Sequence, residues 1–266
     1  MRIVVKIGGQ AAEEARVRRD LARQIVQLRR GGHQITVVHG GGKVLTQTLE
    51  RLGIPVEFHQ GLRVTDAATR DVALMVLAGM VNKQWVAELE AQGQPALGVC
   101  GGDAGLVLVR RLKARTGNGT KDLGFVGRPR KISTRILELA FQERIVPVVA
   151  SLALGPDGEY YNVNADDLAA ALATALKADR LLYLTESGGV WDAERRLLPI
   201  VKRDEIQNLI RKEIVRDGMI PKLRSCARTL RHEVGEIDIL APDAPNGLVR
   251  TVVAHEPVGT RIVKHA

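Results

Sequence analysis

The stretch Val37-Val38-His39-Gly40-Gly41-Gly42 decides the fold of this chain. An apolar, β-branched run from Ile35 to Val38 predicts a buried strand, which ends in three consecutive glycines. A helical pattern follows from about Lys43 to Leu52. Glycines let backbone N–H groups turn toward a ligand, and a helix start adds unpaired N–H donors with partial positive charge. The stretch therefore predicts either a tight structural turn or a backbone cradle for an anion.

Three more glycine-rich turns follow expected strands, at Gly8-Gly9, Gly101-Gly102 and Gly188-Gly189. Buried strands alternate with helical patterns along the whole chain. This order predicts an α/β fold, a three-layer αβα sandwich with a mainly parallel central sheet. Because the carboxyl ends of parallel strands share one edge of a sheet, where ligands bind, the four turns are expected to meet there.

The composition suits a soluble enzyme that handles anions. The 266 residues are 45% hydrophobic and 26% charged, with a formal charge of +9 and a pI of about 9.9. Such a charge also attracts nucleic acid or an acidic partner. Aromatic residues make up only 3%, which predicts an aliphatic core and disfavours nucleic-acid binding through stacked bases. The densest basic clusters are residues 16–19, 110–115 and 128–130.

Cysteine use and hydropathy predict a location. Cys100 and Cys226 lack metal-ligand spacing, and two cysteines in this length imply a reducing compartment. The sequence enters an apolar strand at Arg2 without a charged-then-apolar leader. No apolar run approaches membrane-spanning length. We therefore expect a cytoplasmic protein without a membrane association.

Three charged residues lie where charge is unexpected. Lys6 is one residue from the end of an apolar strand, so it needs a partner or must reach solvent at the sheet edge. Lys222 lies near a helix start, where a cation opposes the helix dipole unless an anion is close; otherwise it is an ordinary surface lysine. Asp166 lies at a strand–helix junction and is either an N-cap or a functional carboxylate.

The order of several motifs resembles the amino acid kinase family over nearly the whole chain, from Ile3 to Ile262. Within that family the resemblance is to members that phosphorylate N-acetyl-L-glutamate, in the second step of arginine biosynthesis. The motifs are Lys6-Ile7-Gly8-Gly9, His39 to Gly42, Gly61-Leu62-Arg63-Val64-Thr65, Asn82-Lys83, Asn162 to Asp166 and Asp217 to Lys222.

The resemblance implies a transfer of phosphate from ATP, with Mg²⁺ held mainly by the nucleotide's phosphates and no dedicated metal site. Lys6 and Lys222 would hold the transferring phosphoryl group from two sides, and Asp166 would fix the two lysines. Gly9 and Gly42 would complete this catalytic set through their backbone N–H groups.

The resemblance also assigns substrate contacts. Gly41 and Gly42 would face the phosphoryl group and the amino-acid substrate, and Arg63 and Asn162 would bind the α-carboxylate of acetylglutamate. The nucleotide would contact Lys6, Gly8, Gly9, Thr185, Glu186 and Lys222.

Elementary chemistry agrees with these roles. Phosphoryl transfer needs positioning and charge neutralisation more than covalent help. A side-chain carboxylate acceptor has a pKa of about 4.3 and is already ionised, so no general base is required. His39 is therefore interpreted as a structural residue that shapes the glycine turn. An arginine such as Arg63 binds a carboxylate through two parallel hydrogen bonds.

A lobe boundary is expected at Lys177-Ala178-Asp179, where a new strand–turn–helix series begins. Residues 1–177 would bind the amino-acid substrate and form a dimer interface, and residues 178–266 would bind ATP. The family usually has Asp where this chain has Glu186, which questions that nucleotide contact. Arginine-inhibited relatives carry a helix before the first strand, whereas this chain begins at the strand. We therefore expect a homodimer without arginine feedback.

Other functions remain open at this point. A kinase for carrier-protein-bound aminoadipate or glutamate, in lysine biosynthesis, would share the fold, and its acidic carrier would explain the charge. Those relatives tend to have Asp-Gly-Asp where this chain has Asn164-Ala165-Asp166. A non-enzymatic anion-binding or nucleic-acid-binding module would leave Lys6 and Lys222 dispensable. A nicotinamide oxidoreductase is disfavoured because the spaced-glycine fingerprint is missing.

Overall fold

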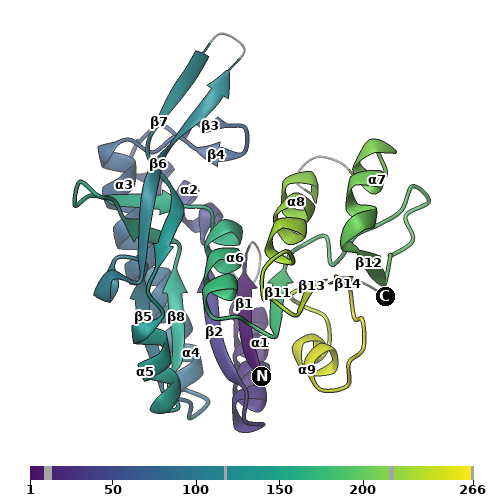
Figure 1. Cartoon of the computed structure of the whole chain (residues 1–266). Coiled ribbons are helices and arrows are strands. Elements are labelled where there is room, and N and C mark those ends of the chain that lie inside the picture. The colour runs from purple at the N-terminus through teal and green to yellow at the C-terminus, as the bar shows by residue number, and fades with distance from the viewer. Residues whose placement is uncertain (9–13, 117–118, 216–218, 265–266) are drawn as a thin grey trace.

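The computed structural model describes residues 1–8, 14–116, 119–215 and 219–264. Within these residues, eight strands form one sheet in the order β12-β14-β13-β11-β1-β2-β8-β5 (Figure 1). All neighbouring pairs are parallel except β13 and β14. The strands are β1 (Arg2–Ile7), β2 (Gln34–His39), β5 (Ala96–Cys100), β8 (Val146–Ala150), β11 (Arg180–Leu184), β12 (Ile200–Lys202), β13 (Glu236–Leu240) and β14 (Thr260–Val263).

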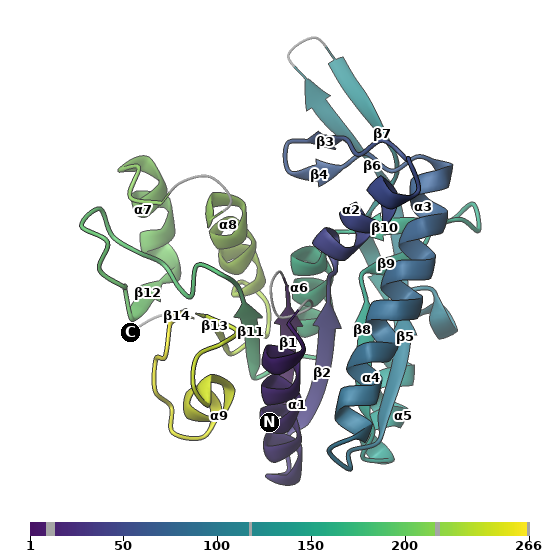
Figure 2. The ribbon, with the colours of Figure 1, turned by 180° about the vertical axis from the view of Figure 1, so that it is seen from behind.

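Helices cover both faces of the sheet and make the three expected layers. One face carries α1 (Ala15–Arg30), α2 (Gly42–Arg51), α3 (Ala67–Ala73), η2 (Leu74–Val81), α4 (Asn82–Glu90) and α9 (Gly247–Val252), seen in front in Figure 2. The other carries α5 (Arg135–Gln142), α6 (Ala165–Ala175), α7 (Ile206–Arg211) and α8 (Met219–Thr229). Short 3₁₀ turns are η3 (Asp103–Gly105) and η4 (Arg203–Glu205). The predicted αβα sandwich is confirmed.

The side chains of β1 explain how a lysine enters this core. Ile3, Val5 and Ile7 face the α1 layer, whereas Val4 packs in the opposite core. Since successive side chains alternate between the two faces of a strand, Lys6 shares the face of Val4. That face is covered by α6 and α8, so the fold directs the ammonium between these two helices.

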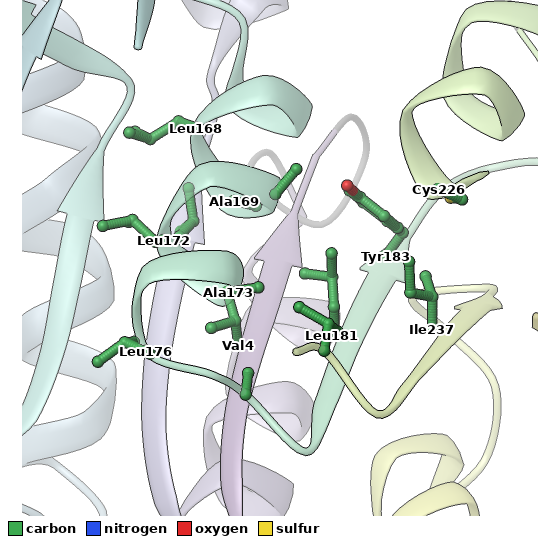
Figure 3. Close-up of a cluster of buried hydrophobic side chains, with 14 of the residues drawn as sticks. Val4, Leu168, Ala169, Leu172, Ala173, Leu176, Leu181, Tyr183, Cys226 and Ile237 are labelled. Atoms are coloured by element: carbon green, nitrogen blue, oxygen red, sulfur yellow. The ribbon is translucent and has the colours of Figure 1, made fainter. Parts of the chain in front are cut away.

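Helix α6 is anchored by one apolar stripe. Leu168, Leu172 and Leu176 are fully buried and pack in one cluster with Val4 and Leu181 of the sheet (Figure 3). This packing fixes the N-terminus of α6 above the carboxyl ends of the central strands. The predicted boundary near residue 177 falls between α6 and β11, and strands from both sides of it join the same sheet.

A second, smaller sheet rises beyond the carboxyl edge of the first (Figure 1). Strands β6 (Val107–Thr116), β7 (Gly119–Ile132), β9 (Leu152–Leu154) and β10 (Tyr160–Val163) close on themselves, and β3 (Phe58–His59) pairs with β4 (Leu62–Arg63) beside them. The sequence predicts only a short extended piece at Leu123 to Gly127, whereas β7 spans 14 residues. Much of β7 is exposed and polar, so its hydropathy pattern predicts a strand shorter than the one observed.

Helices α3, η2 and α4 form one continuous helix from Ala67 to Glu90. Asp66 caps it by accepting a hydrogen bond from the Thr69 N–H at 2.8 Å. By length and composition this helix could cross a membrane, contrary to the expectation that no apolar run reaches that length. In the fold, 44% of its most apolar window is buried, and Trp85 and Leu89 lie in the core. It therefore packs as a core helix.

Candidate active site

Lys6 and Lys222 meet on one carboxylate. The Lys6 ammonium lies 2.8 Å from Oδ1 of Asp166, and the Lys222 ammonium donates a short hydrogen bond to Oδ2 of the same residue. The two lysine side chains are 12% and 11% exposed. The fold thus brings together residues from β1, α6 and α8 that lie far apart in the sequence. Two cations around one anion leave a net positive charge facing the sheet edge.

Asp166 is available for this role because another residue caps its helix. The side chain of Asn164 accepts hydrogen bonds from the N–H groups of Asp166 and Asp167, at 2.9 and 3.2 Å. The N-cap interpretation of Asp166 is therefore wrong. The carboxylate of Asp166, in the first helical turn, is free to point toward β1.

The three charges control the pKa of the central carboxyl. Burial raises the pKa of Asp166, but the ammonium groups of Lys6 and Lys222 outweigh it and hold the pKa at about 2. Asp166 is thus an anion throughout the physiological range. It positions both lysines and is unsuited to act as a general base.

Tyr183 supports the second lysine from below. It is the register partner of Lys6 on the neighbouring strand β11, so both side chains rise from the same face of the sheet. The Lys222 ammonium lies 4.9 Å from the centre of the Tyr183 ring. Cation–π attraction of this kind steadies a desolvated ammonium. Tyr183 is not among the residues expected at the site, because only the register of β11 against β1 places it opposite Lys6.

The glycine turn after β2 has the geometry of an anion cradle. Gly41 is the N-cap of α2 with φ at 150°, and a side chain there would press against Leu77 and Val81 of the long helix. Helix α2 then begins at Gly42. Its first N–H groups have no partner within the helix, so they point toward the space above the strand ends.

His39 holds this turn from beneath. The ring is fully buried, and burial lowers its pKa to about 4, while a hydrogen bond to the Gly40 carbonyl works in the other direction. Nδ1 donates to Gly40 O at 2.8 Å, so Nε2 is the atom that accepts from Asn82 Nδ2 at 3.1 Å. Asn82 also donates to the carbonyl of Val148 at 2.9 Å. This neutral ring has a structural position, in line with the interpretation from sequence.

A cavity of about 240 Å³ includes Lys6 in its wall, whereas Lys222 and Asp166 do not line it. Its lining includes Lys6, Gly8, Gly41, Gly42, Arg63 and Asn162. Apolar side chains, among them Leu45, Leu77 and Val126, form part of the wall. A pocket of this kind binds a small molecule that has both an anionic and an apolar part.

Arg63 is positioned by three neighbours. Its Nη2 donates to Gly42 O at 3.0 Å and to Thr46 Oγ1 at 2.7 Å, and its guanidinium lies 4.6 Å from the ring centre of Phe58. The Nη1 group is buried and has no hydrogen-bond partner among the described residues. Burial lowers the pKa of Arg63, partly offset by Glu50. An unpartnered guanidinium nitrogen at a cavity wall is a site for a carboxylate. Thr46 is not among the residues expected at the site, although it lies one turn after Gly42 in α2.

Two of the expected nucleotide residues, Thr185 and Glu186, lie apart from this cavity, whereas Lys6 and Gly8 line it. Thr185 and Glu186 follow β11 and do not line the cavity wall. Glu186 reaches across to α2, where its carboxylate lies 3.3 Å from the Lys43 ammonium. Gly9 falls outside the described residues. The turn at Gly101 and Gly102 is also separate, because it packs closely against Leu152 and Tyr160.

Comparison with known proteins identifies the family. The model of the amino acid kinase family matches residues 1–240. The chain belongs to the amino acid kinase family. The predicted fold and family resemblance are thereby confirmed.

Several relatives that align over nearly the whole of this chain are named acetylglutamate kinase. The acetylglutamate kinase of Koribacter versatilis (strain Ellin345) is 44% identical over 263 residues, covering 99% of both chains. That of Acidobacterium capsulatum is 45% identical over 263 residues with the same coverage. The solved N-acetylglutamate synthase of Neisseria gonorrhoeae, complexed with coenzyme A and N-acetyl-glutamate, is 25% identical with a TM-score of 0.87. The match covers the whole of this chain and 60% of the synthase chain.

The described part of this amino acid kinase contains no group of three or more His, Cys, Asp or Glu side chains that could hold a metal ion. Asp166, the carboxylate beside the cavity, already binds two ammonium groups. The side chains at this site therefore suit a metal cation that enters bound to a ligand and keeps most of its coordination bonds to that ligand and to water.

Proposed function

We propose that this chain transfers the γ-phosphoryl group of ATP to the side-chain carboxylate of N-acetyl-L-glutamate, forming N-acetyl-L-glutamyl 5-phosphate in arginine biosynthesis. The observation that carries the proposal is the convergence of Lys6 and Lys222 on Asp166, beside a cavity with an unpartnered arginine nitrogen. The name shared by the full-length relatives supports the choice of substrate.

In the proposed reaction the substrate carboxylate attacks the γ-phosphorus, and the bond from that phosphorus to the β-phosphate oxygen breaks to release ADP. The two ammonium groups neutralise charge on the transferring group, and the N–H groups at the start of α2 bind its oxygens. Mg²⁺ would neutralise further charge while bound to the nucleotide's phosphates. The acceptor is already ionised at neutral pH, so His39 has no proton to remove.

Arg63 and Asn162 would hold the α-carboxylate of the substrate. Arg63 Nη1 is buried at the cavity wall, and Asn162 lines the same cavity. The apolar part of the wall, including Leu45 and Leu77, fits the methyl group of an acetyl substituent. Thr185 and Glu186, at the end of β11, would contact the nucleotide.

A coupled ADP-release assay tests the proposal against its competitors. ATP is supplied with free acetylglutamate, free acetylaminoadipate, aspartate or glutamate, and we expect turnover with acetylglutamate above all others. Turnover that requires a carrier-protein-bound aminoadipate would instead favour the lysine-pathway alternative. Arg63→Ala should raise the KM for acetylglutamate about thirtyfold, since a charge-assisted pair contributes about 2 kcal/mol. An unchanged KM would remove Arg63 from the clamp.

We also propose a homodimer through the exposed side of the long helix. Met75 and Met80 are 62% and 45% exposed and line, with Leu52, a hollow of about 380 Å³. A second copy would cover this apolar patch symmetrically. Light scattering of Met75→Glu/Met80→Glu, expected to be monomeric, tests this. The proposed location is the cytoplasm, where the buried free thiols Cys100 and Cys226 stay reduced.

A further inference from the structure

A groove of about 610 Å³ lies between α6, α8 and β7, outside the cavity described above. Its floor is the outer side of α6, formed by Ala170, Ala171, Thr174 and Ala175. The opposite stripe of α6 carries the leucines that anchor it to the sheet (Figure 3). Because the outer residues are small, the chain leaves this space unfilled. The volume is in the range that small-molecule sites have.

The walls of the groove are strongly cationic. Arg128 and Arg130 come from β7, and Arg228 and His232 come from α8. None of the three guanidiniums forms an ion pair or a side-chain hydrogen bond with the residues that the structure describes. Other exposed arginines, such as Arg196, are paired with nearby carboxylates. Three unpaired guanidiniums around one groove favour an anionic ligand.

Charges from both walls of the groove act on the carboxyl group of Asp167. Burial raises the pKa of this carboxyl, and the charges of Arg128 and Arg228 both work to lower it. The pKa remains above its usual value, so the charges of the two arginines do not compensate the burial of this carboxyl. Three arginines, Arg128, Arg130 and Arg228, line the groove with this one carboxylate, which leaves the groove a surplus of positive charge.

Each wall of the groove continues into the active site. β7 carries Val126 of the cavity wall, two residues before Arg128. α6 carries Asp166, and α8 carries Lys222 one turn before Ser225 of the groove. A ligand that joins these three elements would fix the distance between the residues that hold the phosphoryl group.

We propose that this groove is an effector site for a small molecule with two anionic groups, phosphate or carboxylate, that bridges Arg128 and Arg228. Guanidiniums bind both kinds of oxyanion through paired hydrogen bonds. By joining β7 and α6 to α8, the bound ligand fixes the positions of the residues that hold the phosphoryl group. It thereby sets the kcat of the proposed reaction. The regulatory part rests on the proposed function, whereas the binding part does not.

Binding is tested by calorimetry on the full chain with acetylglutamate and a non-hydrolysable ATP analogue filling the active site. The probes are pyrophosphate and succinate, which each carry two anionic groups, at constant ionic strength, and their comparison distinguishes a phosphate from a carboxylate ligand. We expect one saturable site whose affinity falls at least tenfold in Arg128→Ala/Arg228→Ala. The matched control is Lys131→Ala/Arg224→Ala, which removes the same charge from the same two elements outside the groove.

Turnover at saturating substrates supplies the second readout. Each probe that binds should change kcat in the native protein and in the control, and leave the groove variant unaffected. The single variant Arg228→Lys keeps a positive charge at this position, so it should retain part of the change in kcat that the probe causes. No saturable binding, equal losses in both double variants, or binding without a change in kcat would overturn the effector site. Phosphorylation of acetylglutamate without any probe reports the proposed function separately.

Discussion

Asp166 and Asp238 are both carboxylates held between two cations, and they differ in what those cations can still bind. Lys6 and Lys222 surround Asp166 with a net charge of +1 beside a cavity. Asp238 lies 2.9 Å from Arg180 and 2.9 Å from Arg261, and Glu236 lies 2.9 Å from Arg180, so its cluster is neutral. A surplus of cations marks a site for an anion, whereas a balanced cluster is complete by itself.

The surroundings of the two clusters agree with this difference. Arg261 donates to the carbonyls of His255 and Thr251, at 3.1 and 3.2 Å, so both of its terminal nitrogens are bonded within the chain. Burial raises the pKa of Asp238 although both arginines work to lower it, whereas the pKa of Asp166 is about 2. Ion pairs alone therefore do not locate an active site, whereas hydrogen-bond donors without a partner beside a cavity do.

The largest expected effect is on stability, from Asp238→Ala. This change leaves Arg180 and Arg261 buried without their central anion, and should lower the free energy of unfolding by about 3 to 5 kcal/mol. Urea unfolding measures it, and kcat of the folded protein should stay the same. Asp204→Ala, at an exposed carboxylate, is the control. If Asp238→Ala lost as much kcat as Lys6→Met, the clusters around Asp238 and Asp166 would not differ in function as described.

The next effect is on catalysis, from Lys6→Met. Removing one cation from the charged cluster should reduce kcat by about 10²- to 10³-fold, or about 3 to 4 kcal/mol of transition-state stabilisation. KM values should change only a few fold, because the contact matters most in the transition state. Steady-state kinetics decides this. Weaker acetylglutamate binding with full turnover would contradict the role.

A third measurement concerns His39, a buried ionisable group without a charged partner. Its folded-state pKa of about 4 lies below the unfolded value of 6.5, so the unfolded chain binds more protons between these values. Stability should therefore fall as the pH drops from about 6.5 to 4, by about 3 kcal/mol in total. Unfolding curves of native protein and His39→Gln measure this, and the variant should have a flatter profile. Parallel profiles would show that another group causes the acid sensitivity.

The smallest effect is expected at the exposed pair of Lys43 and Glu186. More than half of each side chain is exposed, so Lys43→Ala should change stability by less than about 1 kcal/mol. If Glu186 contacts the nucleotide, Glu186→Gln and Lys43→Ala should both raise the KM for ATP about three- to fivefold, equivalent to less than about 1 kcal/mol. An ATP titration of initial rates tests this, with Lys202→Ala as an exposed control. A change in the KM for acetylglutamate alone would place the pair at the other substrate.

The sequence predicted the features that depend on local pattern. The strand, glycine turn and helix around Gly41 are encoded within about fifteen residues, and the alternation in β1 directs Lys6 to the α6 face. Asn164 and Asp166 show the limit, since both are good N-caps and only the folded geometry selects Asn164. The predicted roles of the site residues and the lobe boundary stay predictions.

Long-range features could not be read from the sequence. Arg180 and Asp238 lie 58 residues apart, and no local period links them. The hairpin of β6 and β7 carries two of the basic clusters, and the exposed polar residues of β7 make that strand longer than its hydropathy pattern predicts. Arg63 was expected at a carboxylate, but its support by Thr46 and Phe58 depends on how two separate elements approach each other.

The central place of β1 has a consequence for biosynthesis. This strand is translated well before its partner β11, which begins only at Arg180. At about 5 to 20 residues per second, the nascent chain waits about 9 to 35 s with one side of β1 unpaired. During that interval the unpaired edge of an apolar strand can pair with another chain, so the nascent protein is exposed to aggregation.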